Sequence, residues 1–399
     1  MKDLINRGKE VFMNTYSQFP LVIEKGDGVY VYDSKGNKYL DFVAGIAVNS
    51  LGYNNEKLVK ALKNQLNKLT HCSNLYWNEP AIEAAELLKK YSTLDKVFFC
   101  NSGAEAVEGS LKLARKYAKK YLGNNKTEII TMKNSFHGRT FGAVTATGQT
   151  KYQKGLGPLL PGIKYCEFNN IKSLEDTIDD KTCAVLVEPI QGEGGIKPAD
   201  VEYLKKVRKL CDKNNLILIF DEVQCGIGRT GEIFAYQHYN VKPDIVALAK
   251  GLGGGVPIGA ILANEKAASG FCPGDHASTF GGNPLVCSAA KVVIEEISDP
   301  QYLENIKKQG KYLTKKLNEL KSKYKMILDV RGHGLMQGME MNMPVKEIIL
   351  ECMDKGLLLV GSGERIIRFV PPLIIQKKEI DSAIKILEDV ILRVKYLND

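Results

Sequence analysis

The sequence predicts an α/β protein with a mostly parallel β-sheet covered by helices, joined to a smaller α+β domain. Three observations support this fold class. Short apolar segments alternate with helical stretches between about residues 96 and 263, these segments carry few polar positions, and the pattern changes after about residue 297. Parallel strands need crossover connections, and strands covered on both faces are apolar throughout. A length of 399 residues accommodates two or three domains of about 150 residues each.

The first elements precede this alternation. Residues 29–33 and 38–42 flank the turn sequence Ser-Lys-Gly-Asn, which predicts a β-hairpin. Residues 55–69 carry leucine and valine at helical spacing and predict a helix. We expect this N-terminal segment, residues 1–50, to pack with the small domain.

The large domain is expected to span residues 51–297. Its helices include residues 104–121 and 201–213, and its strands are expected at residues 96–100, 128–132, 183–187, 216–220, 244–249 and 259–263.

The small α+β domain is expected to span residues 298–399. It begins with a long polar helix at residues 301–323 and ends with a helix near residues 378–396. Strands are expected between them at residues 357–360 and 366–370. No internal repeat or low-complexity tract interrupts this order.

Composition excludes several functional classes. Hydrophobic residues make up 44% and charged residues 25% of the chain, as in ordinary globular proteins. The net charge of +9 suggests nucleic acid, but only nine of the 55 basic residues are arginine. The lysines lie in helical stretches interleaved with apolar residues, which is typical of solvated helix faces. We therefore expect no nucleic-acid partner.

The cysteines and the N-terminal sequence predict a cytoplasmic protein. The nine cysteines form no Cys-x-x-Cys pair and lie mostly in apolar segments, which favours reduced, buried thiols over disulfides or zinc ligands. The first residues lack the apolar core of a signal peptide, and no run approaches the roughly 18 apolar residues of a membrane span. No membrane partner is expected.

Polar residues follow several predicted strands, and ligand sites of α/β sheets lie at the carboxyl ends of strands. Asn101, Ser102 and Gly103 follow the strand at residues 96–100 and open a helix. Small residues there would let a phosphate approach backbone N–H groups and the positive end of the helix dipole. An ordinary N-cap is the alternative interpretation.

An acid and an amine follow two other strands. Asp221 ends a fully apolar strand, and a buried carboxylate needs a partner. Lys250 follows another such strand and precedes a run of glycines, which places an amine in a loop with little side-chain bulk. A capping or ion-pairing acid and one of many solvent-facing lysines are the alternatives. As evidence for a catalytic site, the two residues together carry more weight than either alone.

Two arginines occupy unusual positions. Arg139 lies in a loop beside Phe136, and Arg368 lies within an apolar strand. Such arginines usually meet a carboxylate of the protein or of a substrate. His137 is interpreted as structural, and the histidines show no metal-ligand spacing. No metal is expected.

A dinucleotide-binding fingerprint, Gly-x-Gly-x-x-Gly, occurs at residues 226–231. In dinucleotide-binding proteins the glycine-rich turn joins the strand directly to a helix. Here five residues separate it from the strand, which makes a nicotinamide-dependent oxidoreductase a poor alternative.

These residues belong to ordered blocks through which the chain resembles the class III, fold-type I, pyridoxal 5'-phosphate-dependent aminotransferases. The sequence departs from the family pattern at Tyr53, Val107 and Ala277. The blocks that carry the resemblance are residues 39–42, 45–48, 101–106, 136–140, 188–195, 221–224, 249–251, 278–284 and 368–372.

The resemblance implies pyridoxal phosphate as cofactor and assigns catalytic roles to Lys250 and Asp221. Lys250 would form the Schiff base with the cofactor and then move a proton between substrate and cofactor. Asp221 would pair with the ring nitrogen, an attraction of roughly 4 kcal/mol at 4 Å and an effective dielectric near 20. The other cofactor-binding residues implied are Ser102, Gly103, Ala104, Phe136, Val223, Gln224 and Thr279, the last reaching across a homodimer interface.

The resemblance also implies an amino donor and an acceptor. Arg139, assisted by Ser278, would bind the distal carboxylate of either substrate. Arg368 would bind the carboxylate next to the reacting carbon of glutamate, and Glu193 would neutralise it otherwise. Residues 47–48 and 74–76 favour N2-acetylornithine as donor, and the resemblance implies 2-oxoglutarate as acceptor. Ornithine, succinylornithine, 4-aminobutyrate and lysine-type donors remain alternatives.

Overall fold

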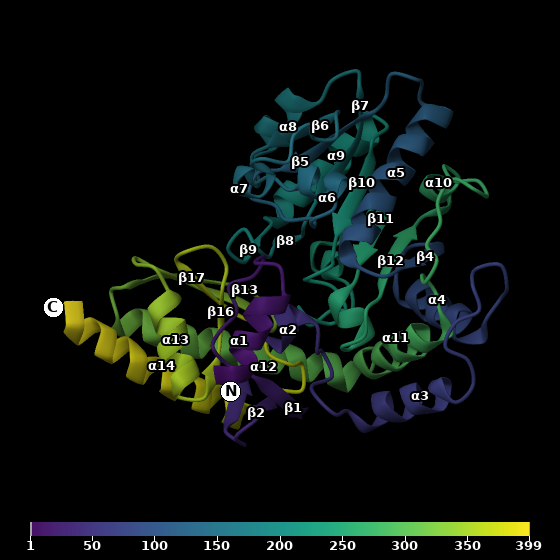
Figure 1. The fold of residues 1–399 in the computed structure, drawn as a ribbon. Helices are drawn as coiled ribbons and strands as arrows, with labels where there is room; N and C mark the ends of the chain where they lie inside the picture. Colours follow the sequence, from purple (N-terminus) through teal and green to yellow (C-terminus); the bar gives the residue numbers. More distant parts are fainter. Residues whose placement is uncertain (1, 399) are drawn as a thin grey trace.

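The computed structural model describes residues 2–398 and contains a central seven-stranded sheet with the order β4-β12-β11-β10-β7-β5-β6 (Figure 1). Four pairings are parallel, whereas β12 runs antiparallel to both neighbours. The predicted mostly parallel α/β sheet is confirmed. The strands are β4 (Lys96–Cys100), β5 (Glu128–Met132), β6 (Ile163–Cys166), β7 (Thr182–Val187), β10 (Ile217–Asp221), β11 (Ile245–Leu248) and β12 (Gly259–Ala263).

Strand β6 is absent from the sequence prediction. It lies at an edge of the sheet, and three of its four side chains are only partly buried. Polar residues are tolerated on such a strand, so its sequence, Ile-Lys-Tyr-Cys, lacks the apolar run that marks the central strands.

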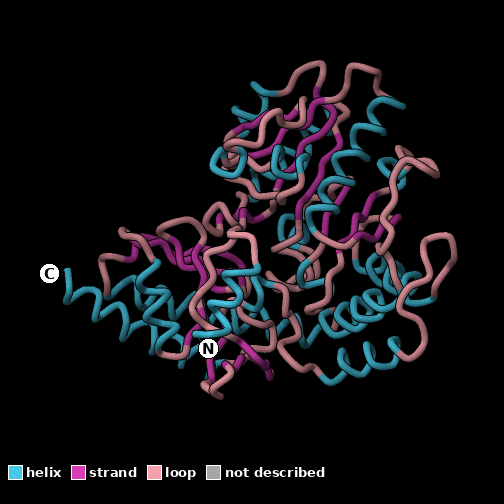
Figure 2. The backbone as a smooth tube through the Cα atoms, in the orientation of Figure 1, coloured by secondary structure: helices cyan, strands magenta, loops and turns pink. Residues whose placement is uncertain are grey.

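Alternate side chains of the central strands enter two different apolar layers. Ile217 and Ile219 of β10 pack with α5 (Gly103–Tyr121), whereas Leu218 and Phe220 enter the layer on the opposite face. Successive side chains of a strand point to opposite faces, so a strand covered on both sides must be apolar at every position. Figure 2 shows the strands between helices.

The opposite layer contains helices α4 (Glu79–Tyr91), α9 (Val201–Lys213) and α11 (Pro284–Ile297). Shorter elements connect the sheet: α6 (Phe141–Ala146), α7 (Thr150–Gln153), α8 (Ile171–Thr177), β8 (Ile190–Gln191), β9 (Lys197–Pro198), η1 (Ala235–Tyr239), η2 (Lys250–Gly253) and α10 (Glu265–Ala268). Helix α3 (Glu56–Leu66) begins at Asn55, whose side chain accepts a hydrogen bond from Leu58 N as an N-cap.

The small domain combines the two ends of the chain. Strands β1 (Ile23–Asp27), β2 (Tyr30–Asp33) and β3 (Lys38–Asp41) are joined by β15 (Leu357–Leu358), which pairs with β3 in parallel. The second small sheet has the order β13-β14-β17-β16. The remaining elements are α12 (Pro300–Lys323), β13 (Ile327–His333), β14 (Met336–Met341), α13 (Lys346–Asp354), β16 (Val360–Gly361), β17 (Ile366–Phe369) and α14 (Lys377–Asn398).

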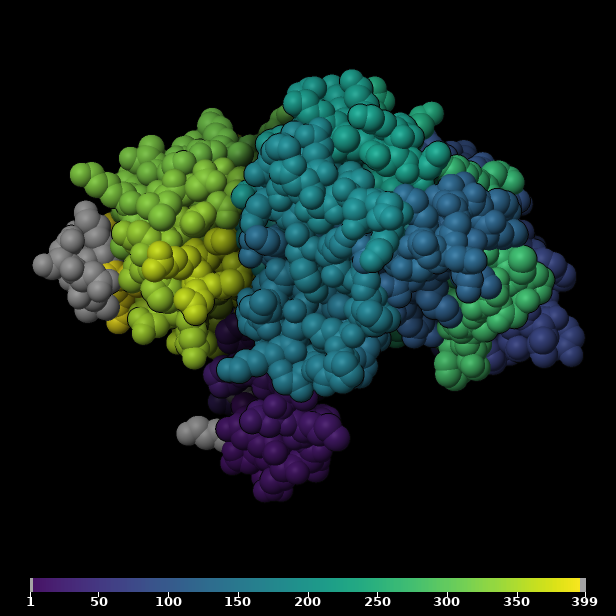
Figure 3. Space-filling model, turned by 90° about the horizontal axis from the view of Figure 1, so that it is seen from above, coloured from purple at the N-terminus to yellow at the C-terminus, as the bar shows by residue number. Residues whose placement is uncertain are grey.

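The boundary predicted at residues 297 and 298 falls between α11 and α12, and the domain division stays a prediction. Helix α1 (Lys2–Val11) and the segment after it stand apart from the body of the molecule (Figure 3). Val11, Phe12, Met13 and Tyr16 are exposed there. Among residues 2–398, none of the helices combines the length and apolar character that a membrane crossing needs.

Candidate active site

A cavity of about 340 Å³ lies beside the carboxyl ends of β4, β7, β10 and β11. This is where parallel α/β sheets bind ligands. Within the described part of the chain, no cluster of histidine, cysteine, aspartate and glutamate has the arrangement of a metal site. The lining residues are Val48, Asn101, Ser102, Gly103, Ala104, Phe136, His137, Glu188, Asp221, Val223, Gln224, Ala249, Lys250, Gly255, Val256, Pro257 and Ile258.

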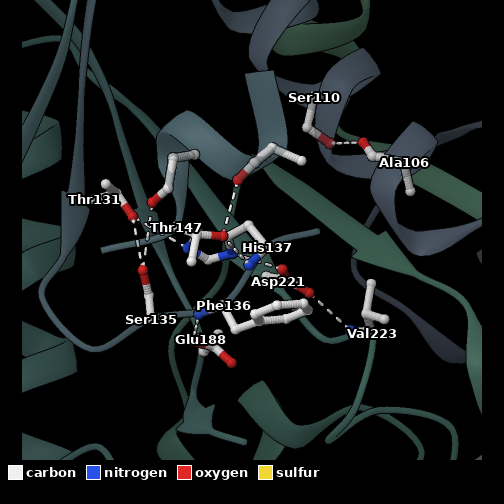
Figure 4. Close-up of polar contacts among 12 residues, drawn as sticks. Ala106, Ser110, Thr131, Ser135, Phe136, His137, Thr147, Glu188, Asp221 and Val223 are labelled. Carbon is white, nitrogen blue, oxygen red and sulfur yellow. Dashed lines mark hydrogen bonds and ion pairs between the residues drawn. The ribbon is translucent and has the colours of Figure 1, made fainter. Parts of the chain in front are cut away.

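Asp221 is the last residue of β10, and its buried carboxylate has two partners. Oδ2 accepts a hydrogen bond from His137 Nδ1 at 2.7 Å, and Oδ1 accepts one from Val223 N at 3.0 Å. His137 Nε2 lies 3.1 Å from Thr131 Oγ1, which fixes the imidazole ring (Figure 4). The carboxylate is therefore held in one orientation at the cavity wall.

His137 has a more direct relation to the site than sequence analysis assigned to it. It was interpreted as structural, and it does lie in the buried interior, but its partner is the carboxylate of Asp221. The only sequence signal was its position next to Phe136. His137 and Asp221 are 84 positions apart in the chain, so their contact depends on the packing of β10 against the loop after β5.

Lys250 begins η2, directly after the apolar strand β11 and Ala249. Its backbone is left-handed, with φ 45°, a conformation uncommon for residues other than glycine and often found at functional sites. Burial and the positive charge of Arg368 lower the pKa of the Lys250 amine, against the opposing effect of Glu193 and Asp221. The amine is thus closer to its neutral, nucleophilic form than an ordinary lysine.

Glu188 lies just after β7 and lines the same cavity. Its carboxylate accepts hydrogen bonds from Phe136 N at 3.0 Å and Gly192 N at 3.1 Å, and burial raises its pKa to about 7. Sequence analysis gave Glu188 no role, although it opens one of the family-like blocks. It fixes the backbone of Phe136, whose ring also lines the cavity.

The first turn of α5 forms another wall. Ser102 caps the helix by accepting a hydrogen bond from Glu105 N at 3.2 Å, so the N-cap interpretation is correct for its side chain. Gly103 and Ala104 line the cavity. A Cβ on Gly103 would lie 2.7 Å from Val223 Cγ1, so the close approach to that loop requires glycine. The helix N-terminus remains a suitable site for an anion.

Buried Arg368 and partly buried Glu193 form an ion pair on the small-domain side of the site. Arg368 is only 1% exposed, and its Nη1 also donates to Gln224 Oε1 at 3.1 Å. Burial alone would raise the pKa of Glu193, but the adjacent Arg368 overcomes this effect and lowers it. Glu193 is therefore an anion facing a cation. Gln224 contacts Arg368 and also lines the cavity.

Arg139, Ser278 and Thr279 lie outside the group that lines the cavity. Arg139 is exposed, with its guanidinium carbon 4.1 Å from the centre of the Tyr152 ring and 5.5 Å from that of Phe136. Ser278 Oγ accepts a hydrogen bond from Asn101 Nδ2 at 3.0 Å, and Thr279 is exposed. None of the three residues lines the cavity of its own chain, and their roles stay predictions.

The fold and the arrangement of an amine, a buried acid and a helix N-terminus are those of a fold-type I pyridoxal phosphate enzyme. The family described as "Aminotransferase class-III" matches residues 11–391. The chain belongs to the class III aminotransferases.

Similar proteins span the whole chain. An acetylornithine aminotransferase from Caldanaerobacter subterraneus is 55% identical, covering 98% of this chain and 100% of the relative. The N-acetylornithine aminotransferase structure from Stenotrophomonas maltophilia is 37% identical with a TM-score of 0.85, covering 96% of this chain and 98% of that one. The ornithine aminotransferase structure from Toxoplasma gondii is 32% identical with a TM-score of 0.95, covering 99% and 96%.

The cavity residues fit the chemistry of pyridoxal phosphate. A second Toxoplasma gondii ornithine aminotransferase structure is described as having partial occupancy of PLP at the protein active site. The cofactor needs an amine for its aldehyde, an acid for its ring nitrogen and donors for its phosphate. Lys250, Asp221 and the first turn of α5 supply these groups around one cavity, and Gly103 leaves room at the helix terminus.

Proposed function

We propose that this chain transfers the terminal amino group of N2-acetylornithine to 2-oxoglutarate, giving N-acetylglutamate 5-semialdehyde and glutamate in arginine biosynthesis. Full-length relatives that are 49–55% identical are named acetylornithine aminotransferase. The structural observation that carries the proposal is the Arg368–Glu193 ion pair beside Lys250, because it offers a carboxylate-binding group that can be neutralised.

Lys250 and Asp221 are the proposed catalytic residues. When bound, pyridoxal phosphate accepts the electrons released when a proton leaves the reacting carbon of the substrate. Lys250 Nζ removes that proton and returns one as a general base and acid, a role for which a lowered pKa is suited. Asp221 stabilises positive charge at the ring nitrogen, and His137 holds its carboxylate in place.

The remaining walls bind and orient the cofactor. Backbone N–H groups at Gly103 and Ala104, together with Ser102, are the proposed phosphate donors. Phe136 packs against the ring, with its backbone held by Glu188. The other proposed cofactor contacts are Val223, Gln224 and Thr279.

The proposed substrate contacts explain how one site accepts two different substrates. N2-acetylornithine has one carboxylate, distant from the reacting carbon, whereas glutamate has a second carboxylate adjacent to it. Arg139, assisted by Ser278, binds the distal carboxylate, and Arg368 binds the adjacent one. When no adjacent carboxylate is present, Glu193 neutralises Arg368. The two substrates therefore react in turn in a ping-pong cycle.

The chain is further proposed to act as a cytoplasmic homodimer. Thr279 lies outside its own chain's cavity, which supports a role in the site of a second copy. All nine cysteines are free, as expected in a reducing compartment.

Separate half-reactions test the proposal. Single-turnover conversion of N2-acetylornithine should exceed that of ornithine, 4-aminobutyrate and lysine. Ornithine is the second candidate donor, because the ornithine aminotransferase structure from Toxoplasma gondii matches the fold of this chain with a TM-score of 0.95. Faster conversion of ornithine would overturn the donor assignment.

The arginine roles are tested with the same assay. Arg368→Ala should slow the glutamate half-reaction at least tenfold and spare the donor half-reaction, since a charge-assisted hydrogen bond contributes about 1.5 to 3 kcal/mol. Arg139→Ala should slow both, and Glu193→Gln should impair the donor half-reaction selectively. Equal losses in both halves for Arg368→Ala would contradict its assignment.

A further inference from the structure

The glycine-rich segment at residues 226–231 has no role in the chemistry described above. It follows the Asp221 loop and reaches the small domain. At its centre is Arg229, an arginine that is only 2% exposed. Few arginines are buried to this extent without an acidic partner.

Arg229 contacts the ends of two neighbouring small-domain strands. Its Nη1 donates to Leu335 O at 3.1 Å and to Pro371 O at 2.5 Å, and its own carbonyl accepts from Leu335 N at 3.1 Å. Leu335 immediately precedes β14, and Pro371 lies two residues after the end of β17. The side chain thus links the large-domain loop to both strands.

Close backbone packing holds the segment in place. A Cβ on Gly334 would lie 2.5 Å from the carbonyl carbon of Thr230, and one on Gly228 would lie 2.4 Å from Ile297 Cγ2. Both glycines have positive φ. The loop therefore has little room to move and replace the arginine contacts with others.

The charge of Arg229 is costly for the fold. Burial lowers its pKa to about 9, and none of the ion pairs among the described residues includes it. Nη2 has no hydrogen-bond partner among those residues. A protein with an apolar residue of similar volume in such a position is often as stable as one with a buried charged group. Stability alone therefore does not account for an arginine here.

The large-domain loop that carries Arg229 contacts strand β17 a second time, at Arg368. In the antiparallel register of β14 and β17, Gly338 pairs with Arg368, and Gln337 pairs with Phe369. The guanidinium of Arg368 contacts Gln224, five residues before Arg229 in the large-domain loop. One loop therefore holds β17 both at the Arg368 side chain and at the backbone three residues beyond it.

We propose that Arg229 is a positioning residue that sets the placement of Arg368 relative to the cavity by fixing the ends of β14 and β17. Arg229 acts through Arg368 and affects the substrate whose carboxylate Arg368 binds. This inference rests on the proposed function, in which that substrate is glutamate or 2-oxoglutarate.

The test compares Arg229→Met with Arg208→Met in the cofactor-loaded enzyme. Arg208 is a matched control: it also donates to a carbonyl, Lys242 O, and pairs with Asp244, which lies at the amino-terminal end of β11, away from the cavity. Arg229→Met should raise the KM for 2-oxoglutarate and the Kd of glutarate, an unreactive dicarboxylate, at least tenfold. The KM for the amino donor should change less than twofold, and Arg208→Met should leave all three constants within twofold.

A double-mutant cycle tests the route of the effect. In an Arg368→Ala background, Arg229→Met should add less than twofold to the Kd of glutarate, because residues that act as one unit are not additive. A full additional loss, equal losses for donor and acceptor, or no loss would each overturn the proposal. If Arg229→Met does not fold by circular dichroism, Arg229→Lys, which keeps a donor at a shorter reach, must show the same selectivity at reduced size.

Failure of the proposed function gives a different result. If the wild-type enzyme does not convert N2-acetylornithine, the donor measurements use the amine it does convert, and the comparison of Arg229 with Arg368 is unchanged. If Arg368→Ala leaves the Kd of glutarate unaltered, the substrate assignment is wrong, and an effect of Arg229→Met would then contradict positioning through Arg368.

Discussion

At the scale of single residues, side chains of the same chemical type differ in their hydrogen-bond donors and neighbouring charges. Asp221 and Glu188 are both buried acids at the ends of adjacent strands. Asp221 has an imidazole donor in His137, whereas the donors to Glu188 among residues 2–398 are backbone N–H groups. Burial raises the pKa of Glu188 to about 7. Lys250 lies between opposite charges, with Arg368 lowering its pKa and Glu193 raising it.

A pH titration of Lys250 tests this arrangement. In the cofactor-free protein, labelling of Lys250 by an amine-acylating reagent increases as the pH rises. We expect this labelling to begin at a pH lower than about 10.4, the usual lysine pKa. Only the neutral amine reacts, so a lowered pKa moves the onset of labelling to lower pH. Glu193→Gln should move it lower still, because the carboxylate that favours the ammonium is gone. Peptide mass spectrometry measures labelling at each pH.

A variant that removes a positive charge instead of a negative one provides the control for this titration. Arg368→Ala removes a positive charge and should move the onset to higher pH. If Lys250 titrates at or above pH 10.4, or if the two variants shift in the same direction, the electrostatic interpretation is wrong.

At the scale of elements, a left-handed turn adjoins the cavity. Residues of α2 (Ala44–Ala47) have positive φ, including Ile46 at 65°, and left-handed helical backbone costs roughly 1–2 kcal/mol per non-glycine residue. Asp41 caps this turn by accepting hydrogen bonds from Val43 N at 2.8 Å and Ala44 N at 3.0 Å. The Tyr53 hydroxyl donates to the same carboxylate at 2.6 Å.

We expect Tyr53→Phe to lower the free energy of unfolding by about 1–3 kcal/mol, because a buried carboxylate loses a donor. Burial raises the pKa of Asp41, with Tyr53, Val43 and Ala44 opposing this effect, and removal of the hydroxyl raises it further. The loss should therefore be greater at pH 7 than near pH 4, where Asp41 is closer to neutral. Denaturant unfolding at both pH values measures it.

Tyr32→Phe, on β2, is a suitable control. The Lys25 amine lies 4.9 Å from the centre of the Tyr32 ring, and the substitution keeps that ring. It should change stability by less than Tyr53→Phe and equally at both pH values. A loss for Tyr53→Phe that is independent of pH would show that the hydroxyl does not support ionised Asp41.

At the scale of the whole molecule, one chain leaves large apolar side chains uncovered. Trp77 is 92% exposed, Leu75 84% and Phe280 58%. Asn74 Nδ2 donates to Ser278 O and Gly281 O, each at 2.9 Å, which connects these exposed residues to the loop that carries Thr279. Large apolar side chains exposed near one another in this way are typical of subunit interfaces.

Mixed dimers test whether the site is shared between two copies of the chain. Lys250→Ala and Thr279→Ala chains should each be nearly inactive alone. If Thr279 serves the partner's cavity, a mixed dimer contains one intact site, and random reassociation should restore about a quarter of wild-type activity. Activity is measured after the chains are mixed, mildly dissociated and reassociated.

One further mixture controls for this result. Lys250→Ala mixed with Asp221→Ala should recover no activity, since both residues belong to the same chain's cavity. Lack of recovery in the first mixture, despite dimers by sedimentation, would mean that Thr279 does not act across the interface.

The sequence alone determined the elements whose signals are local. The central strands are continuous apolar runs and were predicted within one or two residues, whereas the edge strand β6 was missed because its side chains are half exposed. Ordered motifs also indicated the family, and through it the amine, the acid and the two arginines. The structure brings Lys250 and Asp221 to the same cavity.

Tertiary structure alone decided the contacts between distant segments. These include the antiparallel placement of β12, the partnership of His137 with Asp221, and the link from Arg229 to Leu335 and Pro371. Local propensity and periodicity reflect neighbours within a few positions. A bond across 84 or 142 residues forms only when separate elements pack together, so no local pattern in the sequence specifies it.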